Sequence, residues 1–446
     1  IRSDSDLHTF GFAFKPWTSE KSIAQAHEIL EYLEEAVDEH GIRDRIRHGC
    51  EVLGASWSSD EARWTVQVER GDTGERFTLT AGWIFGATGY YDYEAGFTPT
   101  FEGRERFAGE IVHPQHWPED LDYAGKRVVV IGSGATAVTL VPAMVAGGAE
   151  HVTMLQRTPT YIMPVPSEDK LANSLRKILG EERGYAVARQ KNILKQRAVW
   201  KFCQTFPKTA RTLIRSVNAR SLPEGFDVDT HFNPPYDPWD QRLCAVPDGD
   251  LFRTIRHGDA SVVTDRISTF TENGILLESG EELAADVIVT ATGLNLRLFG
   301  GVAISVDGVA LHAPDHVAYK GMMLSGVPNL AFAIGYTNSS WTLKVGLLCE
   351  HFCRLLEHME TEGYDVCVPV APEGLPTRPL LDFAAGYVQR ALDELPRQGE
   401  AHPWAMSMSY GDDVKRIRGG EVVDDALRFS RAGVGSAASA PVGAAV

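Results

Sequence analysis

The sequence lacks the features that would mark a membrane-spanning, disulfide-bonded or nucleic-acid-binding protein. No run of about 18 apolar residues occurs, so no membrane span is expected. The six cysteines form no C-x-x-C pair, which predicts reduced thiols in a cytoplasmic protein. With 60 acidic and 43 basic residues the net charge is -17, which argues against binding to nucleic acids or to anionic membrane surfaces.

Two further absences narrow the chemistry. The sequence contains neither a P-loop nor a cluster of metal ligands, so no metal site is expected. At 446 residues the chain is too long for one ordinary core, and its hydrophobic content of 43% is ordinary for a globular protein. Two or three domains are therefore predicted.

A glycine-rich turn lies between a predicted strand and a predicted helix. Residues 127–131 are apolar, Gly132-x-Gly134-x-x-Ala137 follows, a helix is expected to Ala146, and a second strand is expected over 151–156. Such a turn presents backbone N–H groups and the positive end of the helix to a pyrophosphate. The candidate cofactor-binding residues here are Gly132, Ser133, Gly134, Ala135 and Thr136.

The end of the second strand indicates which nucleotide binds. An NAD site places an acid there, to bond the ribose 2′-hydroxyl. This sequence has Gln156, Arg157 and Thr158 instead, and the planar guanidinium of Arg157 suits a 2′-phosphate, to which Thr158 can add a hydroxyl. The prediction is NADP, and the alternative is an arginine exposed on a loop.

An A-T-G signature occurs twice, each time after an apolar segment. The first copy lies at the end of residues 83–89 and includes Thr88 and Gly89. The second copy lies at the end of residues 286–293. One copy alone fits a core strand that ends in a glycine turn. Two copies that flank a Rossmann unit are what a protein with two nested dinucleotide-binding domains would show, and Thr88 and Gly89 are therefore candidate contacts of a second dinucleotide cofactor.

Residues 107–118 read F-x-G-x-x-x-H-x-x-x-W-P, with fixed positions Phe107, Gly109, His113, Trp117 and Pro118. Taken alone, the segment also fits a proline-rich crossing between two domains. The pattern resembles the fingerprint of the flavin-dependent Baeyer–Villiger monooxygenases. The resemblance is closest to the branch of ethionamide-activating monooxygenases, because the sequence also contains R-S-D-S-D, F-K-P-W-T, I-G-S-G-A-T-A and P-W-D-Q-R-L-C. With these motifs it extends over nearly the whole chain.

The resemblance implies an α/β fold of two nested Rossmann-like domains, for FAD and NADP, with a helical insertion. In the family, R-S-D-S-D follows a first βαβ unit with a G-x-G-x-x-G loop that binds FAD. That unit is not found here, so the sequence predicts a chain that lacks it and that purifies with little or no flavin.

The resemblance also implies the chemistry. Family members use NADPH to reduce FAD, form a C4a-peroxyflavin with O₂ and convert a ketone into an ester; some oxygenate sulfur. Arg242 matches the family's active-site arginine and Asp4 its acidic partner, whereas pairing of Arg242 with Asp237 or Asp240 is the structural alternative. His113 is expected to couple domain movement to NADP binding.

Three further polar residues are candidate cofactor contacts: Gln115, Asn338 and Ser340. For Asn338 and Ser340, capping of the following helix is an equally good explanation. The expected partners are a small ketone or thioether and O₂. Two alternatives to the Baeyer–Villiger reaction stay open: N- or S-oxygenation by a related flavin enzyme, and an inactive NADP-binding fragment.

The predicted layout has four parts: residues 1–120 begin the FAD domain, 121–293 form the NADP domain with a helical insertion over about 167–233, 294–431 complete the FAD domain, and 432–446 are disordered. Within the insertion, an apolar face is expected to pack and the basic residues to form a solvated face. Residues 246–255 are predicted to be strand-like.

Overall fold

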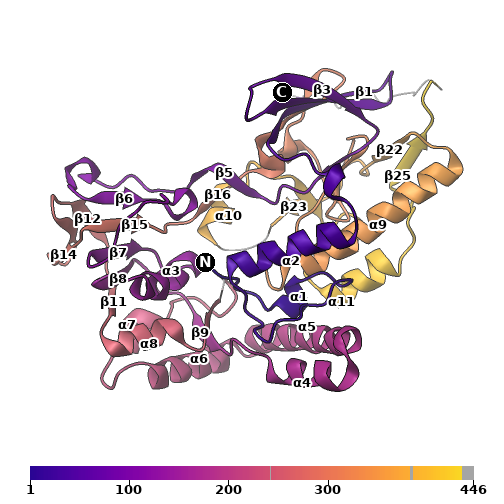
Figure 1. Ribbon diagram of the computed structural model, residues 1–446. Helices are drawn as coiled ribbons and strands as arrows, with labels where there is room; N and C mark the ends of the chain where they lie inside the picture. The colour runs from indigo at the N-terminus through magenta and orange to yellow at the C-terminus, as the bar shows by residue number, and fades with distance from the viewer. Residues whose placement is uncertain (242, 382–384, 434–446) are drawn as a thin grey trace.

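The computed structural model describes residues 1–241, 243–381 and 385–433. Figure 1 shows two sheet-containing parts, with β7 and β8 in one and β1 and β3 in the other, and β5 and β16 between them. Helices α4, α5 and α6 run along the lower edge of this view. The predicted tail lies largely outside the described residues.

The first part is built on the predicted βαβ unit. A parallel sheet of order β11-β8-β7-β15-β6 lies at its centre. Each residue of β15 is buried, as expected for a parallel strand covered on both faces. The bounds are β6 (Glu110–Val112), β7 (Arg127–Ile131), α3 (Ala135–Ala146), β8 (His151–Gln156), β11 (Ala260–Thr264) and β15 (Val287–Thr290).

Residues 246–255 are not one strand, which corrects the prediction. Strand β10 (Cys244–Pro247) pairs in parallel with β9 (Ile162–Val165), and helix α8 (Asp250–His257) follows. Gly249 and Gly258 take left-handed conformations at the two ends of α8, and Leu251, Phe252 and Ile255 are buried on one face. The apolar residues there follow the helical period, not alternation.

The predicted helical insertion is present as α4 (Lys170–Leu179), α5 (Glu181–Thr205), α6 (Pro207–Ser221) and α7 (Val228–Phe232). Pro207 separates α5 from α6 and occupies the first turn of α6, where its missing N–H costs no helical bond.

The faces of the insertion differ from the prediction. Arg176 and Arg189, expected on a solvated face, are each 9% exposed and bind backbone carbonyls of the amino-terminal segment, such as those of Ser19 and His8. Ile178 and Leu194, expected to pack, are 79% and 63% exposed. The helices turn their arginines inward because residues 8–19 present carbonyl oxygens there.

The second part contains a four-stranded sheet of order β19-β20-β21-β4 and an antiparallel meander β1-β2-β3, which β17 and β18 extend. The bounds are β1 (Cys50–Ser58), β2 (Arg63–Arg70), β3 (Arg76–Ala81), β4 (Ile84–Gly86), β17 (Ala303–Val306), β18 (Val309–Ala310), β19 (Ala318–Tyr319), β20 (Met323–Leu324) and β21 (Leu330–Phe332). The first A-T-G segment was expected to be a buried strand. It is shorter and half-buried, since β4 lies at the edge of its sheet.

Long helix α9 (Trp341–Glu362) packs beside this sheet and ends at Gly363, whose φ of 69° is left-handed. The other elements are α1 (Leu7–Phe10), α2 (Ala26–Glu39), β5 (Tyr91–Gly96), β12 (Ile267–Phe270), β13 (Gly274–Leu277), β14 (Glu282–Ala284), β16 (Leu294–Leu296), β22 (Val366–Pro369), β23 (Thr377–Pro379), α10 (Gly386–Arg390), β24 (Arg397–Gly399), α11 (Tyr410–Asp413), a π-helical turn (Val414–Arg418) and β25 (Leu427–Ser430). Within the described ranges, no helix has the length and apolar character that crossing a bilayer would need.

The two A-T-G segments lead into a pair of strands that joins the two parts. Strand β5 follows Gly89 and strand β16 follows Gly293, and the two pair antiparallel, with Leu294 opposite Gly96 and Leu296 opposite Tyr91. We call this pair the linker ribbon. The doubled signature therefore marks the two places where the chain passes between the parts.

Candidate cofactor and active site

The glycine turn after β7 has the geometry of a nucleotide-binding loop. Gly132 has a φ of 136°, and a Cβ there would lie 2.3 Å from the carbonyl oxygen of Ala291, so only glycine fits. Gly134 precedes α3, and a Cβ on it would meet no described atom within 4 Å. Ala137 is fully buried, where it lets α3 pack closely on the sheet.

The loop after β8 lies against this turn. The Ser133 hydroxyl donates to the carbonyl of Thr158 at 3.0 Å and lies 2.8 Å from the hydroxyl of Thr160. Arg157 is exposed, and no ion pair of its guanidinium occurs among the described residues. The turn, the start of α3 and Arg157 thus supply open N–H groups and a cation, which fit a phosphorylated dinucleotide.

His113 docks on the linker ribbon. Its Nε2 lies 3.3 Å from the carbonyl oxygen of Gly293, and its Nδ1 accepts the backbone N–H of Gln115 at 3.2 Å. Burial lowers the pKa of His113, against the smaller opposing effect of the Gly293 carbonyl. Both contacts fit a neutral ring protonated at Nε2. A Cβ on Gly96 would lie 1.9 Å from this ring, so the ribbon leaves room for the imidazole only because residue 96 is glycine.

The other fingerprint residues pack rather than face His113. A Cβ on Gly109 would lie 2.3 Å from the carbonyl of Asp286, and Phe107 is buried in the core under β13. Trp117 packs against the core around α3 and makes an edge contact with Tyr123 at 6.2 Å. Pro118, half-buried, follows it.

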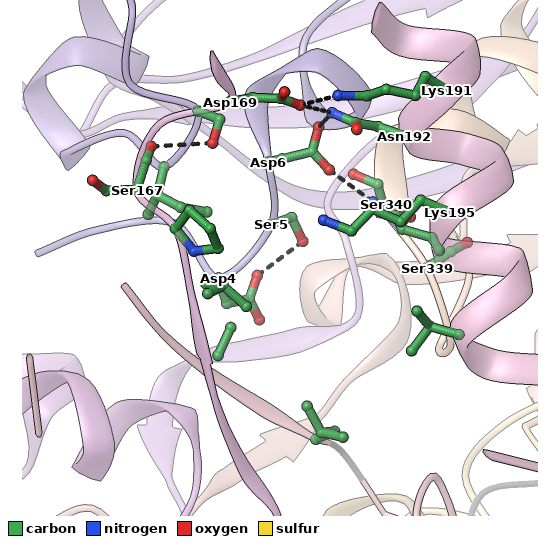
Figure 2. A pocket seen from close by; sticks show the side chains of 18 of the residues that line it. Asp4, Ser5, Asp6, Ser167, Asp169, Lys191, Asn192, Lys195, Ser339 and Ser340 are labelled. Atoms are coloured by element: carbon green, nitrogen blue, oxygen red, sulfur yellow. Dashed lines mark hydrogen bonds and ion pairs between the residues drawn. The ribbon is translucent and has the colours of Figure 1, made fainter. Parts of the chain in front are cut away.

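A cavity of about 850 Å³ lies where α5, the amino-terminal segment and the loop before α9 meet. Figure 2 shows Asp4, Ser5 and Asp6 on one wall and Lys191, Asn192 and Lys195 of α5 on another. The cavity brings together three predicted site residues, Asp4, Asn338 and Ser340. The hydroxyl of Ser5 donates to Asp4 at 3.1 Å.

Arg242 lies outside the described residues, but other residues of its loop are described. Trp239 and Leu243, on either side of it in the sequence, both line the cavity. The alternative pairing with Asp237 or Asp240 therefore stays untested. Asp240 itself accepts the backbone N–H of Asp237 at 3.0 Å and closes a turn in this loop.

Asn338 and Ser340 carry buried polar atoms that the described protein leaves without partners. These are the Oδ1 atom of Asn338 and the Oγ atom of Ser340, although the Asn338 amide donates to the carbonyl of Met408 at 3.0 Å. Ser340 precedes α9 but its side chain makes no capping bond. Because buried polar groups are costly when unpaired, these two atoms fit contacts to a bound ligand.

Other predicted residues lie apart from the cavity. Thr88 and Gly89 lie at the start of the linker ribbon, where the Tyr93 hydroxyl donates to the carbonyl of Thr88 at 2.8 Å. Gln115 donates to the carbonyl of Asp92, and its own carbonyl oxygen is buried without a partner among the described residues. The residues of the glycine turn do not line the cavity.

Sequence reasoning missed the polar network on the cavity wall. Asp6, Asn192 and Gln196 are joined by hydrogen bonds, and Lys191 pairs with Asp169. Asp6 belongs to R-S-D-S-D, but the partners lie in a helix about 190 positions later, whose polar residues resemble any solvated helical face. No cluster of metal ligands occurs in the described part of the chain.

Comparison with known proteins identifies the family to which this chain belongs. Residues 21–301 match the family described as Flavin-binding monooxygenase-like. The chain belongs to this family. The resemblance found in the fingerprint is thereby confirmed at the level of the family.

The chain is similar over nearly its whole length to several curated members. It is 52% identical over 432 residues to the FAD-containing monooxygenase EthA of Mycobacterium tuberculosis (strain ATCC 25618 / H37Rv), covering 97% of this chain and 88% of EthA. It is 47% identical to the putative FAD-containing monooxygenase MymA of the same strain, covering 98% and 90%. The probable FAD-binding monooxygenase AlmA of Acinetobacter sp. is 46% identical, with coverage of 97% and 87%.

Solved structures confirm the predicted α/β fold with two dinucleotide-binding domains. An oxidized steroid monooxygenase bound to NADP superposes with a TM-score of 0.73 at 21% identity, covering 96% of this chain and 90% of the other. The OTEMO complex with FAD and NADP gives 0.70 at 20% identity, covering 96% and 91%. At these identities the likeness concerns the fold alone.

Proposed function

We propose that this flavin-dependent monooxygenase is a Baeyer–Villiger enzyme that uses FAD and NADPH. A ketone, O₂, NADPH and a proton would give an ester, water and NADP⁺. The observation that carries the proposal is the cavity, whose wall joins Asp4, the orphan polar atoms of Asn338 and Ser340, and two residues of the loop that contains Arg242, namely Trp239 and Leu243. The names of the relatives, which contain or bind FAD, support the flavin.

Each residue has a physical role in this proposal. FAD, once reduced by NADPH, supplies the oxygen-activating chemistry. Asn338 and Ser340 would hold its ring, while the turn at Gly132 and the guanidinium of Arg157 would hold the phosphates of NADP. Arg242 would stabilise negative charge on the reacting oxygen atoms, because a guanidinium does not lose its proton near neutral pH.

The direct test is product analysis. The purified chain is incubated with FAD, NADPH and O₂, and is given cyclohexanone or methyl phenyl sulfide in parallel. We expect the lactone from the ketone. A sulfoxide without any lactone would favour the heteroatom-oxygenating alternative, and neither product, with full flavin occupancy, would refute the proposed activity.

Substitution of Arg242 separates its role from flavin reduction. In the Arg242→Ala variant we expect NADPH to bleach the flavin at a near-normal rate while ester formation falls by at least about 10²-fold, the usual effect of removing one charge-stabilising group. Stopped-flow absorbance and product yield measure the two steps. An Arg242→Ala enzyme that still makes ester at the wild-type rate would remove Arg242 from the mechanism.

The thiols of Cys50, Cys203, Cys349, Cys353 and Cys367 are free in the structure, and this supports our proposal that the protein works in a reducing compartment such as the cytoplasm.

A further inference from the structure

Gln196 of α5 touches two chain segments that line the cavity from opposite ends of the sequence. Its amide nitrogen donates to Asp6 Oδ2 at 2.8 Å and to the hydroxyl of Thr9 at 3.0 Å. Its amide oxygen accepts the backbone N–H of Ser340 in a long contact of 3.4 Å. One side chain of the helical insertion thus connects the R-S-D-S-D segment with the loop before α9.

The carboxylate of Asp6 is fully engaged in this junction. Its Oδ1 accepts the Thr9 N–H at 3.1 Å and the Asn192 amide at 3.0 Å, and its Oδ2 accepts the Thr9 hydroxyl at 2.8 Å in addition to Gln196. The same Asn192 amide also reaches Asp169 at 3.2 Å, and Figure 2 shows these groups side by side. Four donors around one carboxylate fix its orientation, and with it the start of α1, which Asp6 caps two residues after Asp4.

We infer that Gln196 is a positioning residue, which sets Asp4 and Ser340 in register on the two sides of the cavity. The inference rests on the proposed function, because it assigns both of those residues to the reacting centre. Gln196 itself does not touch a reacting atom; it acts through Asp6, two residues after Asp4, and through the backbone of Ser340.

Neighbouring contacts hold the same segment at other points. Arg189 donates to the carbonyls of His8 and Gly11, and the hydroxyl of Thr342 donates to that of Phe10. These bonds fix the backbone of residues 8–11. They do not reach the Asp6 side chain, whose donors come from Thr9, Asn192 and Gln196.

Gln196→Glu tests the inference because it keeps the shape of the side chain and replaces its N–H donor with an oxygen that can only accept when ionised. The new carboxylate would still accept the Ser340 N–H, but its second oxygen would replace the donor 2.8 Å from Asp6. Two carboxylates at this distance share a proton at low pH and repel each other once both ionise, so the pKa of the pair is raised. The variant should therefore resemble the wild type near pH 5.5 and lose function as pH rises to 8.

The expected loss in kcat at pH 8 is on the order of tenfold, the effect of about one pKa unit of differential interaction. Other titratable groups face Asp6, namely His8 with Nδ1 at 3.8 Å and the Asp169–Lys191 pair, but they are common to all variants. Gln190→Glu is the matched control: residue 190 is an exposed glutamine of the same helix, and the same change there should leave the pH profile unaltered.

Exchange of the two side chains should rescue the defect. In the double variant Asp6→Asn, Gln196→Glu, the amide oxygen introduced at position 6 keeps the Thr9 N–H and the Asn192 amide as donors. The amide nitrogen introduced there loses the Thr9 hydroxyl bond but donates to the new carboxylate at position 196. We expect the pH 8 activity to return to within about threefold of the wild type. If the double variant is no better than Gln196→Glu, the direct contact is not what sets the site, and the inference fails.

A readout that needs no cofactor separates this inference from the proposed function. Hydrogen exchange of residues 3–9 and 337–342 is measured by mass spectrometry at pH 5.5 and 8. Protection of both segments should fall in Gln196→Glu at pH 8 and recover in the double variant, even if no ketone is oxygenated. Unchanged protection in both segments would overturn the inference, whereas missing lactone in the wild type would count against the proposed function alone.

Discussion

At the scale of single residues, the two glycines of the turn after β7, Gly132 and Gly134, have different roles although they lie two positions apart. Gly132 is needed by the fold, since its φ of 136° and the Ala291 carbonyl 2.3 Å from a would-be Cβ leave no alternative. Gly134 has an ordinary φ of -78° and open space beside it. The open space is where a pyrophosphate would approach.

Alanine at each position should separate the two roles. Gly132→Ala should cost more than about 1–3 kcal/mol of stability from backbone strain, with the clash added. Gly134→Ala should leave the melting temperature unchanged or slightly raised, while weakening NADPH binding. Thermal unfolding and NADPH titration measure the two effects. A Gly134→Ala protein that binds NADPH normally would contradict the placement of the pyrophosphate.

Arg157→Ala should discriminate between the two nicotinamide cofactors. Loss of the charge-assisted bonds to a 2′-phosphate should weaken NADPH by roughly 1–3 kcal/mol and leave NADH nearly unaffected. The KM values for both cofactors give the comparison, and Arg220→Ala, an exposed arginine of α6, serves as the control. Equal losses for NADPH and NADH would defeat the NADP assignment.

At the scale of elements, the loop before α9 is anchored by a buried charge cluster. Lys344 pairs with Asp413 at 3.1 Å, and the Tyr336 hydroxyl donates to Asp413 at 2.7 Å. Burial lowers the pKa of Lys344 and raises that of Tyr336. This cluster fixes α11 against the start of α9 and so supports the cavity residues 337–340.

Removal of the charge at Asp413 should be strongly destabilising. Asp413→Asn leaves a buried ammonium without its counter-charge, which costs about 3–5 kcal/mol. The Lys344→Met, Asp413→Asn double variant should recover much of that loss, because neither charge is then buried. Chemical denaturation of both proteins measures this, with the half-buried Asp412→Asn as the control. If the double variant is as unstable as the single one, the charge pair is not what anchors the loop.

At the scale of the whole molecule, the linker ribbon carries the chain between the two parts, and His113 of the fingerprint contacts it.

Buried histidines such as His351 on α9 add a pH dependence to the stability of the protein. The pKa of His351 is lowered to about 4, first by burial and then by Lys320 and Arg354. Its folded-state pKa lies below the unfolded value of about 6.5, so the stability it contributes is present above pH 6.5 and lost as pH falls toward 4.

His351→Gln should reduce this acid sensitivity. Between pH 7.5 and pH 5, the wild type should lose on the order of 2 kcal/mol more stability than the variant, because one pKa unit corresponds to about 1.4 kcal/mol. Unfolding midpoints at the two pH values provide the measurement. Parallel pH curves for the two proteins would show that the ring titrates normally.

The sequence by itself determined the local elements whose signals are contained in short segments. The βαβ unit at β7 and the helical insertion α4–α7 were both predicted, since hydrophobic period and glycine turns act within a few residues. The fingerprint and the doubled A-T-G signature also predicted the family and the nested fold.

Only the tertiary structure decided which faces are buried and which polar groups meet. Arg189 turns inward and Leu194 outward because residues far away in the sequence supply carbonyl oxygens on the side of α5 that Arg189 faces. The contact of Gln196 with Asp6 and Ser340 joins three segments separated by 190 and 144 positions. A periodic pattern records that a helix has two faces, but the partner of each face is fixed by how distant segments pack against it.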